Sequence, residues 1–237
     1  MTAKELLKEI RAIGSEQIKK ILKNHGASEP VVGAKIEDMK KILKREKIKT
    51  DYKLALELYD TGVYDAMYLA GLIADDDAMT KKDLEHWVDK AYCYGLAEYT
   101  VAWVASEGRF GSDMARKWIE SKKELVAAAG WSTLSSLVSI RDDASLDIPG
   151  LGNLLDRVTK TIHSQPNRVR YTMNGFVIAA GSYVPALTDK ALDVAKKIGV
   201  VSVNVGDTAC KVPDATAYIR KVADRGKIGK KRKTAKC

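Results

Sequence analysis

The chain has 237 residues, of which 46% are apolar and 7% aromatic, and its 40 Lys and Arg residues against 31 Asp and Glu give a net charge of +9. This length and composition predict one soluble globular chain or two small domains. No apolar stretch approaches the roughly 18 residues that a membrane helix needs, so no membrane partner is expected. The first residues, MTAKELLKEIRAIG, carry charges at helical spacing and lack the apolar core of a secretory signal, which leaves a cytoplasmic location as the expectation.

The cysteine content also fits a cytoplasmic location. Cys93, Cys210 and Cys237 are an odd number without CxxC spacing, which fits neither a disulfide scaffold nor a zinc site. We expect three free thiols in a reducing compartment.

The first half of the chain predicts a series of amphipathic helices. Apolar residues recur three and four positions apart from Leu6 to Ile13, and the same period returns at 18–22, 36–43, 54–59, 67–73 and 84–91. Ser15 and Gly26 are typical start and stop signals, and Thr80 with Asp83 forms a candidate capping box.

The second half continues in the same way. Ser112 with Asp113, and later Pro166, are candidate helix starts, and helices are predicted at 115–121, 124–139, 151–164, 168–181, 185–198 and 214–224. About a dozen consecutive helices without strand alternation indicate stacked helical pairs, either a bundle or an α-solenoid. The solenoid is favoured because units such as 53–75, 81–107 and 112–140 recur at about the length of one helical hairpin, although no strict repeat is present.

One run alternates like a strand. Residues 200–205 read VVSVNV and are followed by Gly206 and Asp207. A single strand cannot make a stable sheet, so this run predicts an extended connection or a two-stranded ribbon packed on the last helices.

Positive charge is concentrated at the C-terminus. The last twelve residues, GKIGKKRKTAKC, hold six basic residues and no acid, so the rest of the chain has 34 basic and 31 acidic residues. We therefore divide the chain into a helical domain (1–225) and a basic tail (226–237). Such a tail favours polyanions, because each Lys or Arg placed on a phosphate releases condensed counterions. A merely solubilising terminus is the alternative.

Several motifs do not support a cofactor or a metal. Gly150 and Gly152 form a GxG without a preceding strand, and the third glycine position holds Leu155, so the sequence does not encode a phosphate-binding turn. The three histidines have no metal-binding spacing. The acidic runs at 75–77 and 142–143 fit helix caps better than cation ligands. We expect neither a cofactor nor a metal.

The remaining candidate for chemistry is the aromatic segment AYCYGLAEYTVAW at 91–103. Tyr94 and Glu98 are four residues apart, so a helix places the ring and the carboxylate on one face. In such a pair the ring could pack on a nucleoside, and the carboxylate could act as a base or an electrostatic stabiliser. Alternatively the segment is an ordinary helix start with Tyr92, Tyr99 and Trp103 in the core.

The chain resembles the AlkD-like DNA alkylation repair family, whose HEAT-like repeat members are glycosylases for cationic alkylated purines. The resemblance spans most of the chain and lies in the order of short helices, in AYCYGLAEYTVAWVASE after LEHWVDKA, and in the C-terminal stretch from GDTACKVPDATAYIRK. It implies an all-α fold of HEAT-like repeats stacked in an α-solenoid with a concave face, and duplex DNA as the partner. The family carries Trp-Trp-Asp-x-x-Asp here, so its second Trp falls on Tyr94, its catalytic Asp on Glu98, and its first Trp on Cys93.

The sequence departs from the family at two further positions. A DNA-contacting family arginine falls on Ala128, and an active-site tryptophan falls on Gly175 or Phe176. The resemblance also implies a mechanism: a cationic alkylpurine is already a good leaving group, and a carboxylate stabilises the positive charge that grows on the sugar. Glu98 is the expected catalytic residue, beside Tyr94.

Three hypotheses remain open. The first is a DNA glycosylase that removes N3- or N7-alkylated purines from duplex DNA. The second is a catalytically inactive HEAT-repeat protein that binds damaged or branched DNA, and the third is a protein-interaction scaffold. We prefer the first, with a monomeric protein, and expect DNA contacts from a small set of basic and aromatic residues: Arg168, Arg170, Tyr171, Lys230, Lys231, Arg232 and Lys233.

Overall fold

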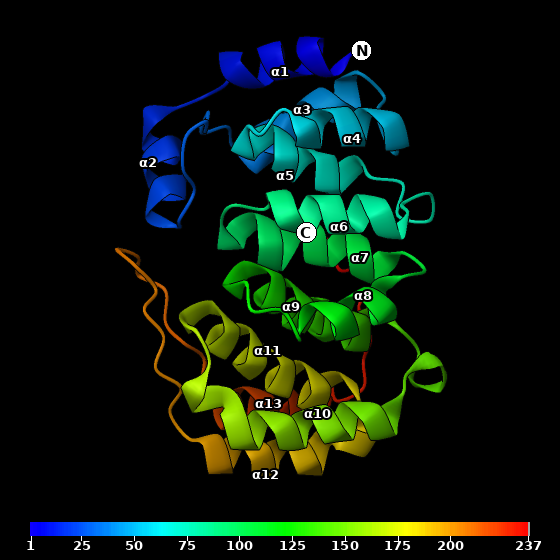
Figure 1. Cartoon of the computed structure of the whole chain (residues 1–237), viewed down its shortest axis with the longest axis vertical. Helices are drawn as coiled ribbons and strands as arrows, with labels where there is room; N and C mark the ends of the chain where they lie inside the picture. Colours follow the sequence, from blue (N-terminus) through cyan, green and yellow to red (C-terminus); the bar gives the residue numbers. More distant parts are fainter. Residues whose placement is uncertain (237) are drawn as a thin grey trace.

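The computed structural model describes residues 1–236, whose regular structure is entirely helical (Figure 1). Cys237 lies outside the described residues. The α-helices are α1 (Ala3–Ala12), α2 (Glu16–Asn24), α3 (Ile36–Arg45), α4 (Tyr52–Asp60), α5 (Tyr64–Ile73), α6 (Lys81–Lys90), α7 (Ala102–Glu107), α8 (Gly111–Trp118), α9 (Glu124–Ile140), α10 (Ile148–Thr161), α11 (Asn167–Tyr183), α12 (Thr188–Ile198) and α13 (Ala215–Asp224). A short π-helix (Leu96–Val101) leads directly into α7.

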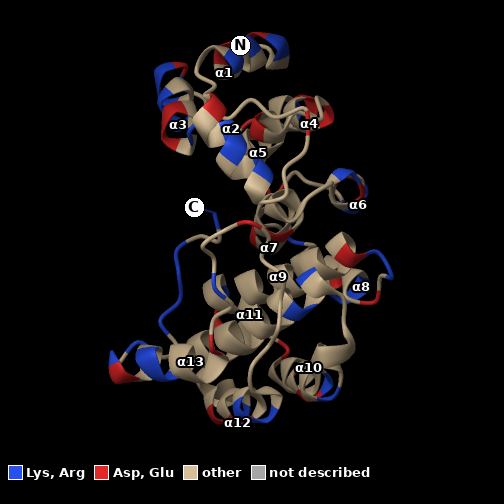
Figure 2. Ribbon diagram, turned by 90° about the vertical axis from the view of Figure 1, so that its left-hand side faces the viewer, with Lys and Arg blue, Asp and Glu red and all other residues tan. Residues whose placement is uncertain are grey.

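From α4 onward the helices alternate between two layers of a curved stack (Figure 2). One layer contains α4, α6, α8, α10 and α12, and the other contains α5, α7, α9, α11 and α13. Most of these helices pack on the preceding helix or on a neighbour in their own layer, as α9 does on α8, α7 and α11. The fold is therefore an α-solenoid of HEAT-like repeats with a concave face, as the sequence predicts.

Ion pairs connect successive helices of the layer that contains α6, α8, α10 and α12. They join side chains 31 to 34 residues apart, close to the length of one helical pair: Lys81 with Asp113, Lys117 with Glu85, Arg116 with Asp147, and Lys190 with Asp156. The sequence has no strict repeat, but these contacts recur at about the length of one helical pair.

Local sequence explains where several helices begin. Thr80 and Asp83 form the predicted capping box of α6, and the Ser15 hydroxyl accepts a hydrogen bond from the backbone of Ile18 at the start of α2. The predicted start at Ser112 is wrong, because α8 begins at Gly111 after Phe110 and has no side-chain cap. Pro166 precedes α11 as expected.

Two apolar clusters form the core, and α9 takes part in both. Its Ala129 packs in the N-terminal cluster, while Trp131 and Val138 pack in the C-terminal one. Gly130 of α9 allows close approach to α8, since a Cβ there would lie 2.7 Å from the backbone nitrogen of Ile119. This helix therefore holds the two halves of the stack together.

The run at 200–205 is an extended connection without a β-partner in the described chain. The segment that it opens, 199–214, crosses from α12 toward the N-terminal helices, and a Cβ at Gly206 would lie 3.2 Å from the carbonyl of Asn24. Residues 225–236 do not extend into solvent. They run back from α13 along the stack (Figure 2), and Ala235 is only 1% exposed within the N-terminal cluster.

No helix among residues 1–236 has both the length and the apolar character needed to cross a bilayer.

Candidate functional site

The candidate site forms around the π-helix at Leu96–Val101. A π-helical turn widens the backbone, and such turns are frequent at functional sites. Gly95 precedes it in close contact with α5, since a Cβ at this position would lie 2.7 Å from the Tyr64 hydroxyl. The backbone at Gly95 therefore lies close against Tyr64, and Glu98 of the following π-helix is buried.

Glu98 forms a bidentate ion pair with Arg168 at the start of α11. The Arg168 Nε donates to Glu98 Oε1 at 2.7 Å and Nη2 donates to Oε2 at 2.6 Å, and the two side chains are 12% and 2% exposed. Burial raises the pKa of the Glu98 carboxyl, and the Arg168 guanidinium acts in the opposite direction. Both carboxylate oxygens are therefore engaged by one cation in a nearly dry environment.

Two tyrosines enclose the Arg168 guanidinium. Its central carbon lies 4.0 Å from the Tyr94 ring centroid and 4.4 Å from that of Tyr171, which are cation–π distances. The Tyr94 hydroxyl lies 2.8 Å from His25 Nδ1, and the backbone nitrogen of Arg168 donates to Glu124 at 2.6 Å. Arg168 is thus fixed at its side chain and at its backbone.

An aromatic pocket of about 380 Å³ opens beside this ion pair. This volume falls in the range of small-molecule pockets. Burial raises the pKa of Tyr94 and of Tyr99 to about 12. The other aromatic side chains of the pocket are those of His25, Tyr64, Tyr68, Trp103 and Tyr171, and Val205 and Cys210 of the crossing segment complete its wall.

A second hollow of about 210 Å³ lies on the other side of Tyr99, Trp103 and Tyr171. Gly175 lines it, and a Cβ at this position would have no atom within 4 Å. Phe176 is fully buried against Trp131, with ring centroids 5.3 Å apart. The hollow therefore has an open place where the resemblance puts an aromatic side chain, and Phe176 does not supply it.

The structure brings four of the expected site residues together: Tyr94, Glu98, Arg168 and Tyr171. Arg170 is not among them, because its guanidinium donates to the carbonyl of Gln165, just before α11, at 3.3 Å. Ala128 is completely buried in α9.

The basic residues of the C-terminal segment lie mostly outside the pocket around Tyr94 and Arg168. Lys230, Lys231 and Arg232 line a groove beside α11 and α13, and Lys233 is exposed. Only Arg232 also borders the hollow that contains Gly175.

Sequence reasoning did not find the N-terminal side of the pocket. His25, Tyr64 and Tyr68 come from parts of the chain at least 26 residues before Tyr94, and no spacing rule connects such distant positions. The richness of the first half in tyrosine was the available signal.

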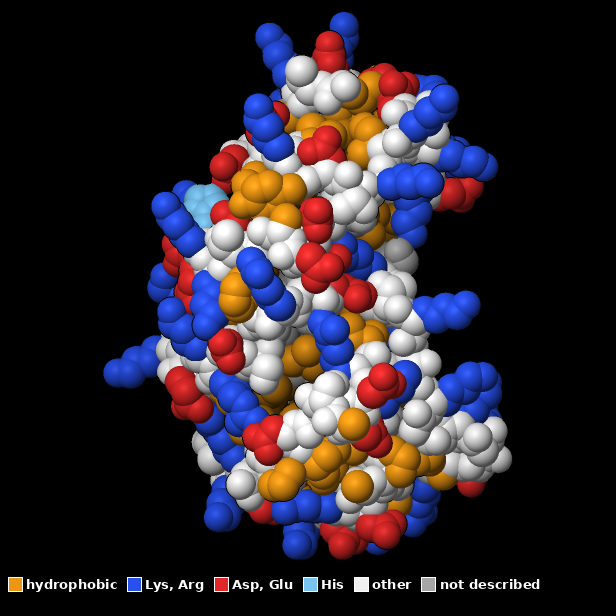
Figure 3. Space-filling view, turned by 90° about the vertical axis from the view of Figure 1, so that its right-hand side faces the viewer, with side chains coloured by type: hydrophobic (Ala, Val, Ile, Leu, Met, Phe, Trp, Pro, Cys, Tyr) orange, Lys and Arg blue, Asp and Glu red, His pale blue; other side chains and the backbone are white. Residues whose placement is uncertain are grey.

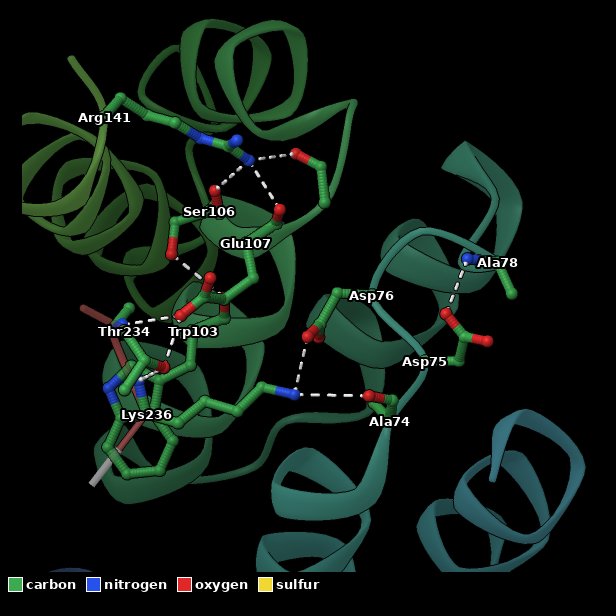
Figure 4. Close-up of polar contacts among 12 residues, drawn as sticks. Ala74, Asp75, Asp76, Ala78, Trp103, Ser106, Glu107, Arg141, Thr234 and Lys236 are labelled. Atoms are coloured by element: carbon green, nitrogen blue, oxygen red, sulfur yellow. Dashed lines mark hydrogen bonds and ion pairs between the residues drawn. The ribbon is translucent and has the colours of Figure 1, made fainter. Parts of the chain in front are cut away.

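The acidic run at 75–77 serves a turn and an ion pair (Figure 4). Asp75 accepts a hydrogen bond from the backbone of Ala78 at 3.2 Å, and Asp76 pairs with Lys236 at 2.7 Å. Within the described part of the chain, no three His, Cys, Asp or Glu side chains are grouped so as to hold a metal ion.

These features define a HEAT-like repeat protein with an aromatic site on its inner layer. The profile of the DNA alkylation repair enzyme family matches residues 6–219, and the chain belongs to this family.

Relatives match over nearly the whole chain. An uncharacterized protein of Listeria innocua is 36% identical over 95% of this chain and 99% of its own length, and one of Listeria monocytogenes is 34% identical over 96% and 100%. A solved structure superposes with a TM-score of 0.91, 41% identity and complete coverage of both chains. It is described as "a new family of proteins related to the HEAT-like repeat DNA glycosylases with affinity for branched DNA structures".

Proposed function

We propose that the protein binds branched DNA on its inner surface and does not excise bases. The observation that carries this proposal is the bidentate pairing of Glu98 with Arg168. A glycosylase carboxylate must present negative charge to the sugar as the glycosidic bond breaks. Here that charge is compensated by a guanidinium, and the carboxylate is 2% exposed.

The surroundings of the ion pair support the same conclusion. The resemblance puts a further active-site tryptophan at Gly175 or Phe176, where Gly175 borders open space and Phe176 is buried, and a DNA-contacting arginine at the buried Ala128. A base would thus lack an aromatic wall on one side, and the strand would lack one positioning cation. Positioning errors of about 1 Å can reduce a rate by about 100-fold, so these differences weigh against catalysis.

Branched DNA is favoured as the ligand by the solved relative. That protein shares 41% of its residues with this chain over the full length and is described as having affinity for branched DNA structures. The net charge of +9 adds the electrostatic attraction that any DNA-binding mode requires. Removal of cationic alkylpurines is the alternative function.

The test compares binding with base release. Wild-type protein and Glu98→Gln are incubated with N-methylated duplex DNA, with an active alkylpurine glycosylase as positive control, and free bases are measured. In parallel, affinity is measured for a four-way junction and for a linear duplex of equal length. We expect no base release by either protein and tighter binding to the junction than to the duplex.

Glu98→Gln keeps an oxygen that can accept from Arg168 and leaves the guanidinium charge in place, so junction affinity should not fall. Thermal unfolding of the variant establishes that it is folded. Release of methylated purines by the wild type, lost in Glu98→Gln, would make the protein a glycosylase. Equal affinity for junction and duplex would refute the preference for branched DNA.

A further inference from the structure

A strongly basic groove lies between α11, α13 and the C-terminal segment, and its Arg232 also borders the hollow that Glu98 lines. We propose that it binds the sugar-phosphate backbone of single-stranded DNA, with a base stacked on Tyr218. Its volume is about 530 Å³. Six basic side chains line it: Lys221, Arg225, Lys227, Lys230, Lys231 and Arg232.

Positive charge in the groove is mostly uncompensated. No Asp or Glu of residues 1–236 lines it, and of the six cations only Lys231 has an acidic partner there, Asp143 at 2.7 Å. Figure 2 shows the other Lys and Arg residues at the end of α13 and along the segment that leads to the C-terminus. The face shown in Figure 3 differs, because its Lys and Arg side chains stand among Asp and Glu.

The cationic segment is anchored before any ligand arrives. The Gly229 amide donates to the Ser182 carbonyl at 2.9 Å, and the Arg232 amide donates to the Ser139 carbonyl at 2.8 Å. Lys231 Nζ also donates to the Val138 carbonyl at 2.8 Å. The segment therefore loses less conformational entropy on binding than a free tail does.

Contacts further along the segment fix its end (Figure 4). Thr234 Oγ1 and the Ala235 amide both donate to the Glu107 carboxylate, the amide at 2.6 Å. Lys236 Nζ donates to the Ala74 carbonyl at 3.2 Å. The groove thus has a rigid wall on its C-terminal side.

An exposed aromatic side chain indicates a nucleic acid. Tyr218 on α13 is 51% exposed and lines the groove, as does Tyr183 of α11. An unpaired base can stack on such a ring while the surrounding cations contact its phosphates.

The groove suits a single strand better than a duplex. In duplex DNA the bases stack on one another and are not available to stack on an exposed protein ring. Sites for single strands combine a basic groove with aromatic stacking. Arg232 also borders the hollow that contains Gly175, so the groove adjoins the surface assigned to branched DNA. The inference rests on the proposed function only in taking DNA as the ligand.

The test uses two probes, a fluorescent oligothymidylate and a four-way junction with fully paired arms. A groove variant, Lys221→Glu, Lys227→Glu and Lys230→Glu, is compared with a control variant, Lys82→Glu, Lys160→Glu and Lys197→Glu. All six lysines are exposed and have no ion pair within residues 1–236, and both variants change the net charge equally. Thermal unfolding establishes that both are folded.

The groove variant should lose oligothymidylate binding at about 50 mM salt, while the control variant loses only a small part of it. Tyr218→Ala should weaken that binding by about tenfold, and Tyr218→Phe should restore it because the ring remains. Equal losses in both triple variants, or unchanged binding in Tyr218→Ala, would overturn the proposal. So would equally tight binding of polyglutamate, which would indicate an acidic protein partner.

The two probes separate this inference from the proposed function. A wild-type protein that binds the junction but not oligothymidylate refutes the single-strand groove alone. One that binds oligothymidylate but not the junction supports the groove and refutes the preference for branched DNA.

Discussion

Gly175 and Gly181 lie on the same helix but have opposite surroundings. A Cβ at Gly175 would meet no atom within 4 Å, whereas a Cβ at Gly181 would lie 2.7 Å from Ile219 Cδ1 and 2.9 Å from Ala191 Cβ. Neither residue has a positive φ. Gly175 is therefore a helix-interior glycine without a steric reason, and Gly181 is required for the contact of α11 with α12 and α13.

We expect Gly175→Ala to raise the free energy of unfolding by about 0.5–1 kcal/mol, because alanine loses less backbone entropy in a helix. Gly181→Ala should lower it by about 1–3 kcal/mol through overpacking. Urea denaturation of both variants measures the difference. A change of the same sign in both would contradict this account of α11.

The residues around Glu98 show what sequence reasoning can reach. The spacing of Tyr94 and Glu98 predicts that the two side chains lie on one face of a helix. In the structure both side chains contact Arg168. Arg168 is 70 residues from Glu98, and its pairing depends on how α11 packs against the π-helix. Helical periodicity describes each helix separately, so it could not distinguish a free carboxylate from a neutralised one.

Among the elements, the C-terminal segment connects α13 with the loop after α5, and one of its polar contacts is titratable. Lys236 pairs with Asp76 at 2.7 Å, and the two side chains are 15% and 20% exposed. Burial raises the pKa of Asp76 to about 6, although Lys236 acts to lower it. Because the folded-state pKa lies above the ordinary value of 3.8, the stability that this carboxyl contributes is present at low pH and lost as the pH rises through about 6.

We expect Lys236→Met to be destabilising in a pH-dependent way. At about pH 7.5 the Asp76 carboxylate is ionised and would lose its partner, which should lower the free energy of unfolding by about 1–3 kcal/mol. At about pH 5 the carboxyl is mostly protonated and the loss should be smaller. Chemical denaturation at both pH values measures this.

Lys233→Met is the matched control, since Lys233 is exposed and has no ion pair among residues 1–236. It should change stability by no more than about 0.5 kcal/mol at either pH. A loss in Lys236→Met that is equal at both pH values would refute the role of Asp76.

Elements with strong local signals were predictable, and those held by distant contacts were not. Helices at 124–140, 167–183 and 215–224 lie close to their expected ranges because apolar period and boundary residues agree there. The composition of 226–237 indicated a solvated tail. In the structure Ala235 and Lys236 contact residues more than 120 positions earlier, and these contacts hold the segment on the stack. No local sequence pattern encodes such contacts.

At the scale of the whole molecule, the charges divide into two groups. Exposed ion pairs such as Lys81 with Asp113 and Lys190 with Asp156 join successive helices and neutralise one another. The cations of the groove between α11 and α13 are largely unpaired within the described chain. The excess of +9 is thus carried in part by a surface that is open to an anionic ligand.

This division predicts that salt acts differently on stability and on DNA binding. Exposed ion pairs contribute about 0–1 kcal/mol each, so raising the salt from about 50 to about 200 mM should change the melting temperature little. If the six cations of the groove contact single-strand phosphates, the affinity for single-stranded DNA should fall by about 300-fold over the same range. Fluorescence anisotropy with oligothymidylate and thermal unfolding in the same buffers measure both effects. An oligothymidylate affinity that persists at the higher salt would mean that the contacts are not made to phosphates, and a large fall in melting temperature would mean that the ion pairs between helices hold the stack together.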